Sequence, residues 1–213
     1  MKNNFVTAFA PASIGNVAVG FDMLGLAIEN VGDRVSARKV EEPGVHINEI
    51  YDEFGEIHMN LSKEASKNTA SISALDFIET NNIDFGVELI IHKGIPLQSG
   101  MGSSAASAVA GVVAVNALLD EPLGKKDLLM HAIEGEKFAS AGLHADNVAP
   151  SLFGGLVFCP QDELPNTIQL NLPNCISSIV LHPDLSVNTA ESRASLKANY
   201  SLSDLLKQSE IGK

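Results

Sequence analysis

The segment from Pro96 to Ala106 has a composition suited to binding an anion. It contains Gly100, Gly102 and three serines, and it leads into a run of small residues, 105–119, that predicts a helix. The first amides of a helix have no partner within the helix, and the helix dipole adds partial positive charge there. We therefore predict that this loop binds a phosphate group through its backbone N–H groups. The loop itself contains no lysine.

Other interpretations of the same loop stay open. It is not a Walker P-loop, because no Gly-Lys-Ser/Thr follows it. It is a poor dinucleotide fingerprint, because Asp120 and Glu121 lie where a second strand should end and instead close a helix. A helix start capped by serines, without a ligand, is one alternative. A serine hydrolase is another, with Ser104 in a degenerate nucleophile elbow followed by Asp146 and His182.

Glu136 is the second candidate for chemistry. The predicted helix 126–141 places it on the same face as Leu129, Ala132 and Ile133. A carboxylate on an apolar face has to be paired or has to bind a metal. A structural ion pair is the plain alternative. Together with a phosphate loop in the same chain, the pattern favours a magnesium ligand.

Two loops carry clusters of polar residues. Residues 142–147 precede an apolar run that predicts a buried strand, and residues 13–22 alternate apolar residues with Gly, Asn and Asp. Loops held by rigid elements often carry binding residues, although Asx turns also explain single members of such clusters. Arg193 is either a surface residue or a clamp for a carboxylate. The polar side chains of the two loops are Asn16, Asp22, His144, Asp146 and Asn147.

Mixed helices and strands must position these residues. The pattern does not alternate strictly between strand and helix, which indicates an α+β fold. A second domain begins near residue 166 but contains one strand and about two helices, so we expect residues 1–165 to form one domain and 166–213 an incomplete second one. We predict strands at 6–10, 25–28, 34–39, 45–50, 87–92, 152–158, 167–172 and 176–182, and helices at 60–79, 105–119, 126–141 and 188–196.

The composition excludes some classes of partner. The 213-residue chain has a net charge of −12, which disfavours nucleic acid and membrane surfaces. Its two cysteines have no metal-binding or redox spacing, and its longest apolar run is too short to cross a bilayer. We expect a soluble cytoplasmic protein with a small-molecule partner. A homodimer stays open.

Taken together, these motifs resemble those of the GHMP kinases, and the homoserine kinases among them most. Residues 96–106 resemble the family's Pro-x-x-x-Gly-Leu-Gly-Ser-Ser-Ala motif, with Met101 in place of the usual leucine. Residues 10–16 and 20–22 resemble the first homoserine kinase motif, and His144-Ala145-Asp146-Asn147-Val148-Ala149-Pro150 resembles the signature after the central helix. The likeness extends from about Phe5 to Leu196.

The resemblance implies a two-domain fold, with an N-terminal β-α-β domain that carries the phosphate loop and the start of a ferredoxin-like C-terminal domain. It implies ATP-dependent phosphorylation of the side-chain hydroxyl of L-homoserine to O-phospho-L-homoserine, a step of threonine biosynthesis, with Mg²⁺. Another GHMP small-molecule kinase and an inactive nucleotide-binding fragment stay open. Nothing after Arg193 resembles the family's C-terminal glycine-rich loop.

The resemblance also implies roles for single residues. Asn147, Glu136 and Ser104 would be catalytic, with Ser104 and Glu136 on the metal. Asn147 stands where some relatives have an aspartate base, so no general base is evident. The ATP site would comprise Asn68, near the adenosine, and Pro96, Gln98, Ser99, Gly100, Met101, Gly102, Ser103 and Ser104. The acceptor site would comprise Asn16, Asp22, His144, Asn147, Thr189 and Arg193.

Overall fold

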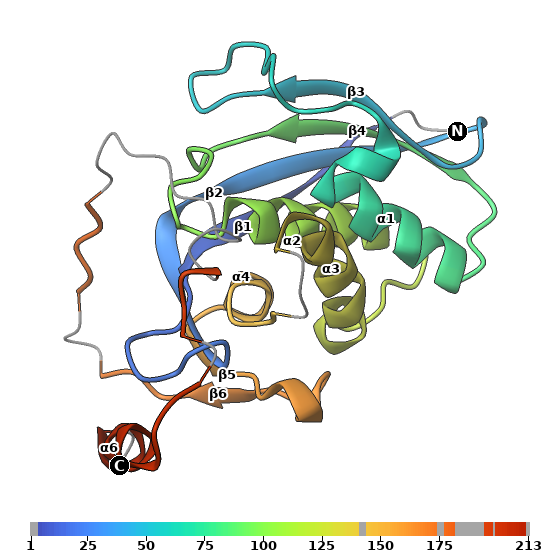
Figure 1. Ribbon diagram of the computed structural model, residues 1–213. Helices are drawn as coiled ribbons and strands as arrows, with labels where there is room; N and C mark the ends of the chain where they lie inside the picture. Colours follow the sequence, from blue (N-terminus) through green and yellow to red (C-terminus); the bar gives the residue numbers. More distant parts are fainter. Residues whose placement is uncertain (1–3, 141–143, 174–176, 182–193, 198, 212–213) are drawn as a thin grey trace.

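A twisted sheet with helices packed against one face forms the body of the protein (Figure 1). The computed structural model describes residues 4–140, 144–173, 177–181, 194–197 and 199–211. Its elements are β1 (Val6–Ile14), β2 (Leu24–Val40), β3 (Val45–Tyr51), α1 (Thr69–Thr80), β4 (Gly86–His92), α2 (Ser103–Asn116), α3 (Lys125–Ser140), α4 (Val148–Phe153), β5 (Leu156–Phe158), β6 (Ile168–Leu170) and α6 (Leu202–Ile211), with short 3-10 helices at Ala65–Lys67 and Gln161–Glu163.

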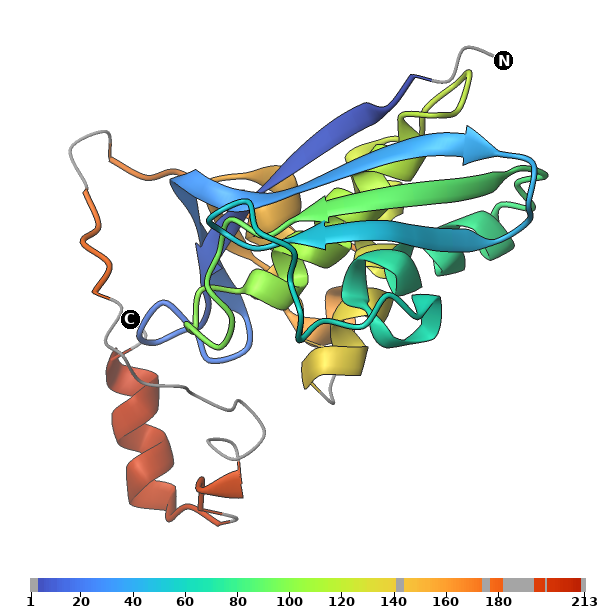
Figure 2. The same cartoon turned by 90° about the horizontal axis from the view of Figure 1, so that it is seen from above.

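The strands form one mostly antiparallel sheet. Its order is β3-β4-β2-β5-β6, with β1 also paired to β2, and β3 runs parallel to β4. Helices α1 to α4 lie on one face of this sheet, as the two views show together (Figure 2). Fully buried side chains such as Val35, Leu89 and Phe77 fill the space between the layers. The arrangement confirms the predicted α+β class.

Helix α2 lies at the centre of the layers because its side chains are small. Nearly all of its residues are buried, and it contacts β1 and β2 on one side and α1 and α3 on the other. At Gly111 the helices approach so closely that a Cβ atom would lie 2.3 Å from the carbonyl oxygen of Ala70. The central position of α2 places its N-terminus, and the loop before it, among residues from several elements.

The predicted strands 25–28 and 34–39 are one strand, β2. The sequence predicted a break because Asn30 and Gly32 interrupt the pattern. Asn30 does take a left-handed conformation, with φ of 66°, but β1 pairs on both sides of this point and shifts register to absorb it. The partner on the other edge changes there from β5 to β4. One strand therefore serves both halves of the sheet.

Other predicted boundaries are also wrong. Helix α1 begins at Thr69 rather than at 60, because the side chain of Asn68 caps it by accepting from the N–H of Ala70. The predicted strand 152–158 is helix α4 up to Phe153 and strand β5 only from Leu156. Pro150 is compatible with this helix because it lies in the first turn, where a missing N–H costs nothing.

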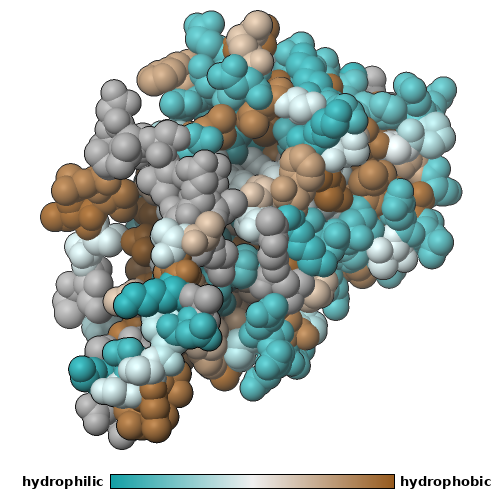
Figure 3. Space-filling model, viewed as in Figure 1, coloured by the Kyte–Doolittle hydropathy of each residue, from teal (hydrophilic) through white to brown (hydrophobic). Residues whose placement is uncertain are grey.

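The C-terminal segment lies beside this body (Figure 1). Residues 177–181 take no regular structure, contrary to the predicted strand 176–182, and most of the predicted helix 188–196 lies outside the described residues. Exposed apolar side chains gather on 177–181 and α6, including Ile179, Leu181 and Leu202 (Figure 3). Among the described helices, none combines the length and apolar character that a bilayer crossing requires.

Candidate active site

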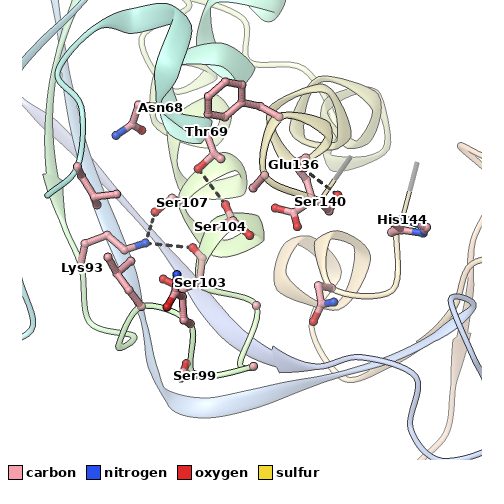
Figure 4. A pocket seen from close by; sticks show the side chains of 18 of the residues that line it. Asn68, Thr69, Lys93, Ser99, Ser103, Ser104, Ser107, Glu136, Ser140 and His144 are labelled. Carbon is pink, nitrogen blue, oxygen red and sulfur yellow. Dashed lines mark hydrogen bonds between the residues drawn. The ribbon is translucent and has the colours of Figure 1, made fainter. Parts of the chain in front are cut away.

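A cavity of about 460 Å³ lies at the N-terminal end of α2 (Figure 4). The predicted residues that line it are Asn16, Asp22, Asn68, Gln98, Ser99, Gly100, Gly102, Ser103, Ser104, Glu136, His144 and Asn147. Pro96 and Met101, which were also predicted, do not line it. Thr189 and Arg193 lie outside the described residues. The cavity therefore brings together residues from five separate stretches of the sequence.

The loop before α2 has the backbone geometry of an anion-binding turn. Gly102 is the N-cap of α2 in the left-handed region, with φ of 66°, and no side chain caps the first turn. Gly100 has a φ of 73°. A Cβ atom on Gly102 would lie 2.3 Å from the hydroxyl of Ser13, so both conformation and space require glycine there. The uncapped end of α2 leaves its first amides available to a ligand.

A buried lysine that the sequence analysis missed forms the floor of the cavity. Lys93 follows β4, and its side chain is only 4% exposed. Its Nζ atom donates to the carboxylate of Asp33, to the Ser107 hydroxyl at 2.6 Å and to the Ser103 carbonyl at 3.1 Å. Burial lowers the pKa of Lys93, and the carboxylate of Asp33 opposes this shift. The loop contains no lysine, but the fold supplies one beneath it.

Glu136 faces inward from α3, as the helical spacing predicts. Its side chain is 7% exposed, and its Oε2 atom is buried without a hydrogen-bond partner among the described residues. Burial raises the pKa of Glu136 to about 7, and the nearby Ser104 hydroxyl lowers it by hydrogen bonding. Asp146 adds to the increase and Lys93 opposes it. Figure 4 shows the carboxylate on the α2 side of α3, near Ser104.

The opposite wall of the cavity is acidic and polar. Asp146 is 3% exposed, and its Oδ2 atom accepts from the N–H of Asn16 at 3.1 Å. Burial raises the pKa of Asp146; the bond from Asn16 lowers it, and Asp22 raises it further. The Nδ1 atom of His144 lies 3.6 Å from Oδ2 of Asp22. A ligand group placed here would meet carboxylates, which favours a cation such as an ammonium.

Asn147 and Asn68 are held by contacts within the protein. Oδ1 of Asn147 accepts from the hydroxyl of Ser13 at 2.9 Å, which ties the end of β1 to the start of α4. Nδ2 of Asn68 donates to the carbonyl of Ser62 at 3.3 Å, while its Oδ1 caps α1. Both residues still line the cavity. Their orientation is therefore fixed before any ligand binds.

Comparisons with known proteins place this arrangement in a family. Residues 61–155 match the family described as GHMP kinases N terminal domain. This stretch is therefore a GHMP kinase N-terminal domain. The chain is 44% identical over 202 residues to a homoserine kinase of Xylella fastidiosa strain M12, covering 95% of this chain and 61% of that protein. It therefore spans about three fifths of the length of that curated relative.

Solved structures of GHMP kinases share the fold. The structure of a homoserine kinase from Cytophaga hutchinsonii matches with a TM-score of 0.87 at 40% identity, covering all of this chain and 66% of that one. A mevalonate kinase from Methanococcus jannaschii matches with a TM-score of 0.61 at 15% identity, over 80% of this chain and 57% of that one. The second likeness concerns the fold alone.

The GHMP kinase site contains residues that sequence reasoning missed. Asp33, Lys93 and Ser107 lie at or beneath the floor of the cavity, and none was a candidate. A signal for Asp33 was present, because it alternates with Val35 and Ala37 on the buried face of β2. A carboxylate on that face demands a buried cation. The sequence does not show which lysine provides it.

A divalent metal fits this GHMP kinase cavity when a phosphate completes its ligands. Among the described residues, no group of three or more His, Cys, Asp or Glu side chains is arranged to hold a metal. The unpartnered Oε2 atom of Glu136 beside the Ser104 hydroxyl supplies an oxygen set of the kind Mg²⁺ accepts, in which protein carboxylates combine with phosphate oxygens.

Proposed function

We propose that this chain forms the nucleotide-binding part of a kinase that transfers the γ-phosphoryl group of ATP to the side-chain hydroxyl of L-homoserine. The observation that carries the proposal is the uncapped start of α2, which shares one cavity with the buried carboxylate of Glu136, whose Oε2 atom has no hydrogen-bond partner among the described residues. The relatives from Xylella fastidiosa and Cytophaga hutchinsonii are named homoserine kinases, which supports this acceptor.

In this proposal the loop and α2 hold the phosphates of ATP. The amides of the first turn, next to Gly102, would receive the terminal phosphates, and Ser104 and Glu136 would hold Mg²⁺. When bound, the metal neutralises phosphate charge. Asn68 lines the cavity together with Leu61 and Lys67, and the nucleoside would bind beside them.

The acceptor would bind on the acidic side of the cavity. Asp22 and His144 lie close together there and would hold the ammonium group of the amino acid. Asn147, fixed by Ser13, would align the attacking hydroxyl. Phosphoryl transfer has a loose transition state that depends mainly on alignment and charge, so an amide at this position is compatible with catalysis. The hydroxyl proton would pass to a phosphate oxygen.

The deciding experiment measures ADP formation from ATP with homoserine, shikimate, mevalonate and galactose as acceptors. It is run on this chain and on a chain extended to the length of its relatives, and ³¹P NMR identifies the product. We expect homoserine-dependent turnover that Asn147→Ala lowers. Turnover with another acceptor alone would replace the proposed substrate. If neither chain binds ATP, the kinase proposal fails, and turnover by the extended chain alone would make the 213-residue chain a non-catalytic fragment.

A second experiment tests the metal site. ATP affinity is measured by calorimetry with and without Mg²⁺ in the wild type and in Glu136→Gln. We expect magnesium to increase the affinity of the wild type and to have little effect on the variant. Glu134→Gln is the matched control, since Glu134 is on the same helix but pairs with Lys137 outside the cavity. An unchanged magnesium response in Glu136→Gln would remove Glu136 from the metal site.

The geometry does not favour the serine hydrolase. The hydroxyl of Ser104 lies beside the carboxylate of Glu136. Acyl transfer by a serine needs a base such as an imidazole within hydrogen-bond reach. Asp146, the predicted acid of that triad, instead accepts from the N–H of Asn16. His182 lies outside the described residues. Labelling of Ser104 by an active-site serine reagent would reverse this judgement.

A further inference from the structure

Three buried side chains from three elements form one cluster beneath the phosphate loop. Asp33 comes from β2, Lys93 follows β4, and Ser107 comes from the second turn of α2. Asp33 is fully buried, and the other two are 4% and 3% exposed. The Ser107 hydroxyl donates to Oδ2 of Asp33 at 2.6 Å, and that carboxylate also binds the Lys93 ammonium. We call this group the Asp33–Lys93–Ser107 cluster.

The ammonium of Lys93 has no donor left for a ligand. A lysine has three N–H donors. They go to the Asp33 carboxylate, the Ser107 hydroxyl and the Ser103 carbonyl. Lys93 therefore differs from a P-loop lysine, which binds phosphate directly.

The cluster is bonded to the chain on both sides of the phosphate loop. On the side of β4, Oδ1 of Asp33 accepts from the N–H groups of Gly94 at 2.9 Å and Ile95 at 3.2 Å. On the side of α2, Lys93 donates to the carbonyl of Ser103. The loop between these points contains left-handed backbone at Gln98, Gly100 and Gly102. Such a loop keeps one conformation only when its surroundings determine it.

We propose that the Asp33–Lys93–Ser107 cluster is a positioning element that fixes both ends of the loop at residues 94–102 in the conformation that receives phosphate. The affinity for the phosphates of a nucleotide then depends on three residues that do not contact them. The affinity for the nucleoside alone does not depend on these three residues. The part of this inference that concerns ligand affinity rests on the proposed function; the part that concerns loop conformation does not.

The test compares two double variants of the whole chain. Asp33→Asn with Lys93→Met removes both buried charges while keeping similar volumes and an acceptor for the amides of Gly94 and Ile95. The control is Arg38→Met with Glu88→Gln, which removes a 2.8 Å ion pair between the same two strands, β2 and β4. Arg38 and Glu88 do not line the cavity. The two variants thus differ in their relation to the loop rather than in the strands they join.

Hydrogen exchange is measured first, in the absence of ligand. We expect the amides of Gly94, Ile95 and Ala106 to exchange about tenfold faster in the cluster variant, with α1 and α3 unchanged. The control should leave all these amides as in the wild type. Unchanged protection of the loop in a folded cluster variant would overturn the proposal. If the double variant does not fold, Ser107→Ala is measured in its place. We then expect the same amides to exchange about threefold faster than in the wild type.

Calorimetry then compares ATP with adenosine. We expect the cluster variant to bind ATP about tenfold more weakly and to bind adenosine within about twofold of the wild type. Faster exchange with unchanged ATP affinity would overturn the link between the cluster and phosphate affinity. A wild type that binds neither ligand would refute the proposed function, and the exchange measurement would still decide the positioning role.

Discussion

The buried polar groups at the floor of the cavity are hydrogen-bonded within the protein, whereas several of those on its wall are not. On the floor, the charged groups of Asp33 and Lys93 have all their hydrogen bonds within the protein. The wall is the cavity lining around this floor, where Oε2 of Glu136, the Ser99 hydroxyl and Nδ1 of His144 are buried without hydrogen-bond partners among the described residues. Because folded proteins pair nearly all buried polar atoms, such exceptions need an explanation. The floor therefore has the pairing of a structural element, and the unpaired wall is consistent with the proposed binding of a ligand.

Breaking the floor should have the largest effect on stability. Lys93→Met leaves the carboxylate of Asp33 buried without its cation, because the two groups are 0% and 4% exposed in the wild type. Removing one partner of a buried ion pair costs about 3–5 kcal/mol. We expect the free energy of unfolding, measured with urea, to fall by that amount. Lys126→Met, which removes an exposed bond to Asn166, should change it by less than about 0.5 kcal/mol. Equal losses in both variants would refute the assignment of the floor as a structural element.

Removing the charge of Glu136 from the wall should raise the free energy of unfolding at high pH instead of lowering it. Burial raises the pKa of Glu136 from 4.5 to about 7, so the native state holds this proton more tightly than the unfolded chain does. The resulting stability is fully present below pH 4.5 and is lost as the pH rises through about 7. Glu136→Gln removes this loss, and at pH 8 the variant should be more stable than the wild type by roughly 2–4 kcal/mol.

The measurement is the free energy of unfolding at pH 5 and pH 8. The wild type should lose more stability between these values than Glu136→Gln does. The variant should keep a smaller dependence, because burial also raises the pKa of Asp146. Glu134→Gln, which breaks a partly exposed pair with Lys137, should change stability by about 0–1 kcal/mol at either pH. A Glu136 variant less stable than the wild type at pH 8 would mean that the carboxylate has a structural partner.

Two glycines separate conformational strain from crowding at the mouth of the cavity. Gly100 and Gly102 both have positive φ, but a Cβ atom on Gly100 would meet nothing within 4 Å, whereas one on Gly102 would lie 2.3 Å from the hydroxyl of Ser13. Gly100→Ala should destabilise by about 1–2 kcal/mol from the left-handed backbone alone. Gly102→Ala should cost about 1–3 kcal/mol more, because the contact with Ser13 must open. Equal losses in thermal unfolding would show that this contact is not tight.

The sequence predicted the wall better than the floor. Glu136 was predicted to face inward because it shares a helical face with Leu129, Ala132 and Ile133, and periodicity within one element is visible in the chain. The loop before α2 was also selected from a local signal, its glycines and serines. Both signals span fewer than about twenty residues. The α+β class follows from the same local signals.

The floor depends on contacts between distant parts of the chain. Asp33 is 60 residues from Lys93 and 74 from Ser107, and their meeting follows from the pairing of β2 with β4. Nothing in the local pattern specifies that pairing. The same limitation explains why β2 was divided at Asn30, since pairing with β1 and β5 keeps the strand continuous there. Tertiary pairing overrides local propensity at such positions.

Two serines provide the finest comparison of floor and wall. The hydroxyl of Ser107 donates to Asp33 and accepts from Lys93, whereas the buried hydroxyl of Ser99 has no partner among the described residues. Ser107→Ala leaves two charged groups each short of a hydrogen bond and should lower the free energy of unfolding by about 1–3 kcal/mol. Ser99→Ala loses no bond and should stay within about 0.5 kcal/mol of the wild type, measured by urea unfolding without ligand. If ligand phosphates supply the missing partner, Ser99→Ala should lose part of the stabilisation that ATP gives the wild type. In that measurement the effect of Ser99→Ala should exceed that of Ser107→Ala. A destabilised Ser99→Ala in the free protein would contradict the distinction, because it would mean that this hydroxyl already has a structural role.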